Sequence, residues 1–93
     1  MPPVKKCYVV TFEVGNEATR REVRGRLKGY GTYCPITKYC WGIVTEQTAS
    51  QIRDNIKEAL EPTDRVFVVR SGTEAAWNNS YGPKNNSWLK KHL

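Results

Sequence analysis

Residues 7–14 alternate between two sets of side chains, as a β-strand does. The segment is rich in β-branched and aromatic residues, which favour strands. Because successive side chains of a strand point to opposite faces of a sheet, the segment has a core face and a second face. The core face carries Tyr8, Val10, Phe12 and Val14, and the second face carries Cys7, Val9, Thr11 and Glu13. The second face is half apolar, which favours self-association.

A helix is predicted for residues 17–28. Val23 and Leu27 recur at helical spacing within this segment. Asn16 is a suitable N-cap, since its side chain can accept a hydrogen bond from the first turn. Gly29 directly follows the segment, and glycine is the usual residue just after a helix.

Two short strands are predicted next, over residues 32–38 and 40–45, joined by a turn at Lys38-Tyr39. The second of them is rich in β-branched and aromatic residues. The two strands are close enough in sequence to form a hairpin.

The pattern then predicts a second helix and a last strand. Thr48 and Gln51 have the spacing of a capping box, which opens a helix, and Pro62 ends it. Residues 65–70 read as a core strand. Strand, helix, hairpin, helix, strand is the order of the ferredoxin-like βαββαβ fold. We therefore expect an α+β domain with an antiparallel sheet over residues 1–72.

Residues 73–93 differ in composition from the rest and form a C-terminal extension. The segment is rich in asparagine and contains Trp77 and Trp88. Tryptophan seldom lies in a free tail, because its large apolar ring is stabilised by burial. We expect the extension to pack on the domain or on a partner subunit.

The charge is concentrated on the first predicted helix. The 93-residue chain has a formal net charge of +6, which favours polyanionic partners. Residues 17–28 contain five basic and two acidic residues, so 5 − 2 = +3 lies on this helix. Arg20, Arg24 and Lys28 follow one another at i, i+4 and i+8 and form a ridge, with Arg21 beside it. These four residues are candidates for binding nucleic-acid phosphates; the alternative is a solvated charged helix face.

The numbers and spacing of the cysteine and histidine residues limit which metal sites this chain can form. Cys7, Cys34 and Cys40 are an odd number without zinc-site spacing, and we expect them to be small buried residues. His92 is the single histidine, so a histidine-rich metal site is excluded. The sequence has no long apolar run and no signal-like start. We therefore expect a cytoplasmic protein without a membrane segment, and a chain this short makes a homodimer reasonable.

Glu13, at the end of the first strand, is the candidate catalytic and metal-binding residue. In a dimer that pairs through the second sheet face, the two copies of Glu13 could approach each other and bind Mg²⁺ or Mn²⁺. With arginines nearby to bind phosphates, such a site would support cleavage of a phosphodiester. The alternative is an ordinary exposed glutamate.

Two segments carry a resemblance to a known family. YVVTFEVGN at residues 8–16 and TRREVRGRLKGYG at residues 19–31 resemble the small CRISPR-associated adaptation protein that partners the spacer integrase. That family begins with a strand ending in Tyr-Asp-Ile/Val, followed by a helix of the form Arg-Arg-x-x-Val-x-x-x-Leu-x-x-x-Gly. The virulence-associated protein D toxins share this fold. The ending WNNSYGPKNNSWLKK is most similar to that of stand-alone bacterial proteins labelled SinR-like.

The resemblance implies a homodimer that binds nucleic acid through basic residues and, in some members, a metal-dependent endonuclease of RNA or DNA. By position, Glu13 replaces the family aspartate, and Arg20, Arg21 and Arg24 replace the helix basics. Phe12-Glu13 stands where Tyr-Asp is usual, which moves the carboxylate one methylene further out. Three functions therefore stay open: a nucleic-acid-binding scaffold, an endonuclease resembling a toxin, and a protein-interaction module. An integrase-type protein or an antitoxin is the partner that the resemblance suggests.

Overall fold

The computed structural model describes residues 4–72 and 74–93. Four strands and three helices follow one another along this part of the chain. In chain order they are β1 (Lys6–Glu13), α1 (Glu17–Lys28), β2 (Tyr33–Thr37), β3 (Cys40–Thr45), α2 (Ala49–Lys57), β4 (Arg65–Arg70) and α3 (Pro83–His92).

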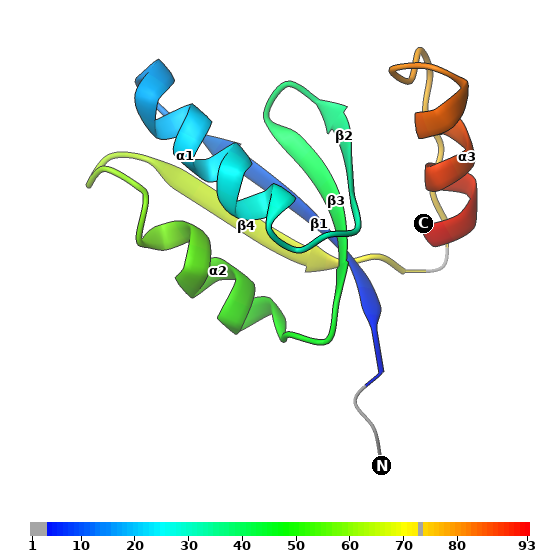
Figure 1. The fold of residues 1–93 in the computed structure, drawn as a ribbon, viewed down its shortest axis with the longest axis horizontal. Coiled ribbons are helices and arrows are strands. Elements are labelled where there is room, and N and C mark those ends of the chain that lie inside the picture. The colour runs from blue at the N-terminus through cyan, green and yellow to red at the C-terminus, as the bar shows by residue number, and fades with distance from the viewer. Residues whose placement is uncertain (1–3, 73) are drawn as a thin grey trace.

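The four strands form one antiparallel sheet in the order β2-β3-β1-β4. This order, with β1 and β3 in the centre, confirms the α+β class and the ferredoxin-like arrangement predicted from the sequence. Helices α1 and α2 cover one face of the sheet, and α3 lies beyond β2 (Figure 1). Among the described residues, no helix is both long and apolar enough to cross a membrane.

The core lies between the sheet and the helices α1 and α2. Tyr8, Val10 and Phe12 of β1 are at most 4% exposed, as the alternation predicted. They pack with residues of the two helices and of β3 in one cluster, whose other buried members are Val23, Leu27, Trp41, Ile43, Ile52 and Ile56. Burial of these side chains is the main stabilising contribution to a domain of this size.

Both helices of the domain begin at the predicted caps. The Asn16 side chain accepts a hydrogen bond from the Thr19 amide at 2.7 Å. Thr48 and Gln51 form the reciprocal bonds of a capping box, at 2.9 and 3.2 Å. Pro62 was predicted to end the second helix, but α2 ends earlier, at Lys57. Hydrogen bonds between residues three apart, typical of tight turns, follow it in the chain.

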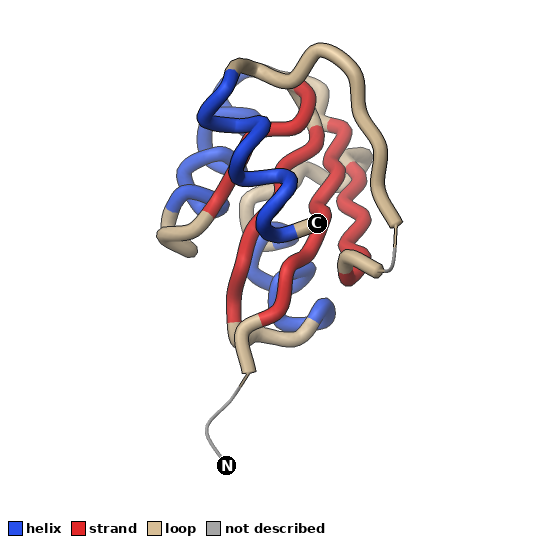
Figure 2. The backbone as a smooth tube through the Cα atoms, turned by 90° about the vertical axis from the view of Figure 1, so that its right-hand side faces the viewer, coloured by secondary structure: helices blue, strands red, loops and turns tan. Residues whose placement is uncertain are grey.

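The C-terminal extension returns to the β2 edge of the sheet and forms α3, which lies along this edge (Figure 2). The Asn85 side chain donates a hydrogen bond to the Pro35 carbonyl at 3.1 Å, so an edge-strand carbonyl that would face solvent has a partner. Leu89 is buried. The Trp88 ring lies against Gly42 so closely that a Cβ at this glycine would be 2.9 Å from it.

Candidate nucleic-acid interface

Helix α1 presents different arginines to different neighbours. Its buried side faces the sheet through Thr19, Val23 and Leu27. The predicted ridge lies on another side, where Arg20 and Arg24 share the carboxylate of Glu17, at 3.1 and 3.4 Å. Glu17 therefore holds these two guanidinium groups next to each other. Because Glu17 is exposed, the two ion pairs are weak, and the donors of Arg24, whose side chain is 32% exposed, can also reach a ligand.

Arg20 is also part of the packing between α1 and the β2–β3 hairpin. Its side chain is only 13% exposed, and its guanidinium carbon lies 5.7 Å from the centre of the Tyr39 ring. The buried Nε atom of Arg20 has no hydrogen-bond partner. Phe12 meets the same tyrosine ring edge to face, with the ring centres 5.9 Å apart. Arg20 therefore fixes the hairpin turn against the helix as well as adding positive charge.

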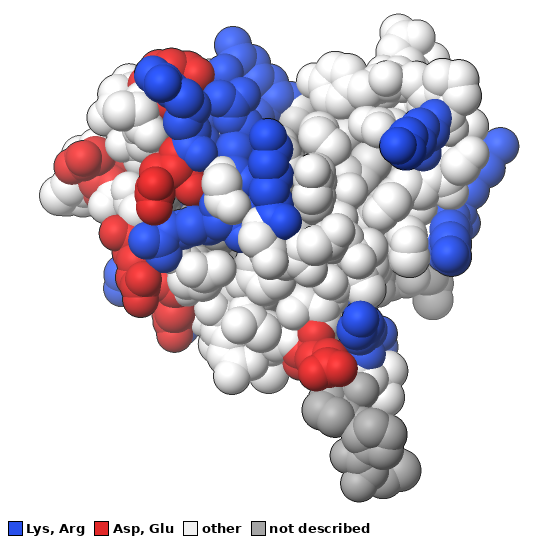
Figure 3. Space-filling model, viewed as in Figure 1, with Lys and Arg blue, Asp and Glu red and all other residues white. Residues whose placement is uncertain are grey.

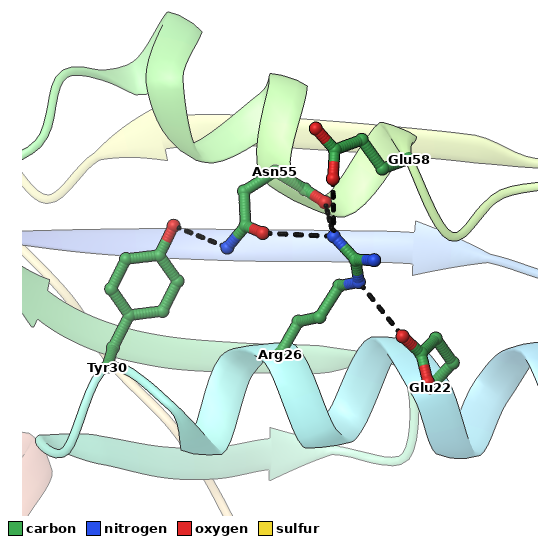
Figure 4. A network of polar contacts seen from close by, with 5 residues as sticks. All are labelled: Glu22, Arg26, Tyr30, Asn55 and Glu58. Carbon is green, nitrogen blue, oxygen red and sulfur yellow. Dashed lines mark hydrogen bonds and ion pairs between the residues drawn. The ribbon is translucent and has the colours of Figure 1, made fainter.

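Arg26 belongs to a different network, on the side of α1 that faces α2 (Figure 4). Its guanidinium donates to Glu22, to Glu58 and to both the carbonyl and the side-chain oxygen of Asn55, at 2.8–3.2 Å. The carboxylates of Glu58 and Glu22 raise the pKa of Arg26. Tyr30 continues the network, accepting a hydrogen bond from Asn55 at 3.0 Å. Arg26 therefore joins α1 to α2, and its Nε and Nη1 donors are occupied by protein acceptors.

The remaining cations of α1 are available to a ligand. Arg21 and Lys28 are exposed. Lys38, in the turn of the hairpin, adds a third exposed cation from outside the helix, with its Nζ 5.7 Å from the Tyr39 ring centre. Lysine and arginine atoms gather over this part of the molecule, and acidic side chains lie to one side of them (Figure 3). We call this the basic surface: Arg20, Arg21, Arg24, Lys28 and Lys38.

Lys38 was not among the predicted binding residues, although the sequence placed it in the hairpin turn. A basic residue in a turn is ordinary by itself. Tyr39, its neighbour in sequence, contacts Arg20 of α1, and Lys38 lines a groove together with Arg24 of the same helix. The contact between α1 and the hairpin joins segments far apart in sequence and is visible only in the folded chain.

Glu13 lies at the end of β1, opposite Arg65 of β4 in the sheet register. The two side chains form an ion pair, and both are more than 70% exposed. They border a hollow of about 760 Å³, which Asp64 also lines. Asp64 is engaged in loop structure, accepting hydrogen bonds from the amides of Gly15 and Glu61 at 3.0 and 2.9 Å.

These residues do not fit a resident Mg²⁺ or Mn²⁺ ion within one copy of the chain. Such ions need several oxygen ligands in a defined geometry. The carboxylate of Glu13 is instead paired with a guanidinium group. In residues 4–72 and 74–93 there is no group of three or more His, Cys, Asp or Glu side chains that could hold a metal. Shared use of Glu13 by two copies stays a hypothesis.

The three cysteines are free thiols. Cys34 is buried, and Cys7 and Cys40 are half-buried. Burial raises the pKa of all three thiols. Because the thiolate is the nucleophilic form, these cysteines are poorly suited to nucleophilic catalysis at neutral pH.

Fold and site thus define a small α+β protein of ferredoxin-like order with a basic helix and an added C-terminal helix. Comparisons with models of known protein families and with curated proteins found no match for this chain.

Proposed function

We propose that this protein is a dimeric, cytoplasmic, nucleic-acid-associated protein that binds the phosphate backbone through the basic surface. The observation that carries the proposal is that the basic residues of α1 differ in whether protein groups already bind them. Arg26 is occupied by its carboxylate partners, whereas Arg21 and Lys28 are exposed. Exposed cations gathered on one surface are the usual electrostatic footprint of a nucleic-acid-binding protein.

The dimer is supported by the sheet face opposite α1 and α2. Phe67 and Val69 of β4 are 64% and 45% exposed there. Their register partners Thr11 and Val9 of β1 are half-buried on the same face. We call these four residues the open face. An exposed apolar patch on a sheet is suited to pairing with a second copy around a two-fold axis.

Binding to DNA and RNA duplexes as a function of salt tests the proposed function. We expect the double variant Arg21→Ala/Lys28→Ala to bind more weakly and to show a flatter salt dependence. Each lost phosphate contact lowers the slope of log K against log [salt] by about 0.9 on B-form DNA. Arg26→Ala is the control on the same helix and removes one charge instead of two. Its affinity should fall by much less than half as much, because the Nε and Nη1 donors of Arg26 face protein acceptors.

Circular dichroism would verify that each variant is folded. A loss in the control about half as large as in the double variant, in proportion to the one and two charges removed, would mean that only net charge matters. No binding by the wild-type protein at low salt would refute the proposed function and favour a protein-interaction module.

The second candidate function is a metal-dependent endonuclease, favoured by the hollow that Glu13, Asp64 and Arg65 line. Since Glu13 has no further acidic ligands grouped with it among the described residues of one copy, we expect binding without cleavage. Incubation of RNA and DNA with the protein, with and without Mg²⁺ or Mn²⁺, distinguishes the two functions. Metal-dependent cleavage that disappears in Glu13→Gln would establish the endonuclease instead. Cleavage that persists in this variant would come from another site or a contaminant.

A further inference from the structure

A second feature borders the basic surface, namely a groove between α1 and α3 over the β2–β3 hairpin (the elements are labelled in Figure 1). Pro35, Thr37 and Trp41 of the hairpin line it, together with Arg24 and Lys38 on the basic surface. Tyr81 and Asn85 from the C-terminal extension complete the lining. The groove has a volume of about 370 Å³, at the lower end of the range for small-ligand sites.

The lining combines positive charge with aromatic area. Arg24 and Lys38 carry the charge, and no lining residue is acidic. The ion pair of Arg24 with Glu17 is long, at 3.4 Å, so most of its donor capacity is available. Tyr81 is 62% exposed, and its ring has no protein ring stacked on it among the described residues.

The same combination continues beyond Lys38. Tyr39, next to it in the turn, is 41% exposed. Lys38 therefore lines the same groove as Tyr81 and also contacts the ring of Tyr39. Alternation of exposed rings and cations is the arrangement that proteins use for single-stranded nucleic acids. The bases stack on the rings, and the cations follow the backbone.

We propose, on the basis of the nucleic-acid binding proposed above, that this groove holds an unpaired nucleotide and gives the protein a preference for single strands. The base stacks on Tyr81, and the adjacent phosphates contact Arg24 and Lys38. In a duplex the bases stack on one another and expose only their edges, so an exposed ring cannot stack on them. The basic surface alone would bind either form, and the groove adds affinity for unpaired segments only.

The test compares affinities of the full chain for oligothymidylate, oligouridylate and a DNA duplex of the same length, by fluorescence anisotropy at one fixed salt concentration. We expect the wild-type protein to bind single strands more tightly than the duplex. Tyr81→Ser should lower single-strand affinity about tenfold, the effect of removing one stacked ring, and leave duplex affinity within about twofold. Tyr81→Phe keeps the ring and should retain the preference. The two homopolymers show whether the groove distinguishes DNA from RNA.

Folding is monitored in the same samples by circular dichroism and by the fluorescence of the tryptophans near α3. Equal single-strand affinity of Tyr81→Ser and wild type would overturn the groove assignment and leave the proposed function intact. An equal loss for single strands and duplex would also overturn it, since the ring would then act through the fold. No binding to any of the three ligands would refute the proposed function itself.

Discussion

Trp88 of α3 covers Gly42 of β3, at a distance that leaves no space for a side chain on the strand. A Cβ at residue 42 would lie 2.9 Å from the indole ring. Glycine in a strand interior lowers stability by itself, since it loses more conformational freedom on folding and packs no side chain. Here it permits the close approach of the C-terminal helix. The pair therefore explains how a separate segment attaches to the sheet.

Replacing Gly42 by alanine should destabilise the protein. The new methyl group displaces the Trp88 ring, and overpacking of this kind costs about 1–3 kcal/mol. Urea denaturation measures the free energy of unfolding. The control is Gly25→Ala on α1, where a Cβ meets no atom within 4 Å. This substitution should stabilise the protein by about 0.5–1 kcal/mol, because alanine is the better helix former.

A double-mutant cycle with Trp88→Ala identifies the cause. If the clash between the new methyl group and the indole ring is responsible, the cost of Gly42→Ala should largely disappear in the Trp88→Ala background. An unchanged cost would show that the strand, and not the docked helix, is sensitive to the substitution.

Arg20 and Arg21 are neighbours in sequence and should respond differently to alanine. Arg20 packs on Tyr39 and pairs with Glu17, so its removal should lower the free energy of unfolding by about 1 kcal/mol. Arg21 is exposed, and its removal should change stability by less than about 0.5 kcal/mol. Thermal denaturation of the two variants checks this difference. Equal melting temperatures would contradict the packing role of Arg20.

The open face predicts the oligomeric state. Wild-type protein should be a dimer by light scattering at micromolar concentration, and Phe67→Glu should be a monomer, because a charge would be buried at the interface. Thr63→Glu adds the same charge at an exposed loop residue next to β4 and should stay dimeric. A monomeric wild-type protein would remove both the dimer and the shared Glu13 site.

Buried Cys34 should make the protein less stable at alkaline pH. Burial raises the pKa of this thiol, so the folded chain keeps a proton that the unfolded chain releases above about pH 8.5. The stabilising effect is present below that pH and is lost as the pH rises through the folded-state pKa. Between neutral and alkaline pH, the urea midpoint should therefore fall further for wild type than for Cys34→Ala. An identical fall of the urea midpoint in the two proteins would show that the Cys34 thiol does not cause the loss of stability.

The local sequence pattern was enough to predict the four strands and the helices α1 and α2. The two-residue period of β1 predicted the buried face of Tyr8, Val10 and Phe12, and the caps at Asn16 and Thr48 predicted where the helices begin. These signals lie within a few residues of each other, and neighbouring residues suffice to interpret them. Helix α3 was missed because its apolar residues are few and its support comes from the β2 edge.

The sequence by itself determined the order of the four strands and of α1 and α2, the two faces of β1 and the concentration of charge on α1. Only the tertiary structure decided which charged side chains have a protein partner and which are exposed to a ligand. It pairs Arg26 with Glu58, 32 residues away, and packs Arg20 on the hairpin turn. It also pairs Glu13 with Arg65, 52 residues away. The physical reason is that hydrogen bonds and ion pairs depend on distance in space, whereas sequence patterns report only which face of an element a residue occupies.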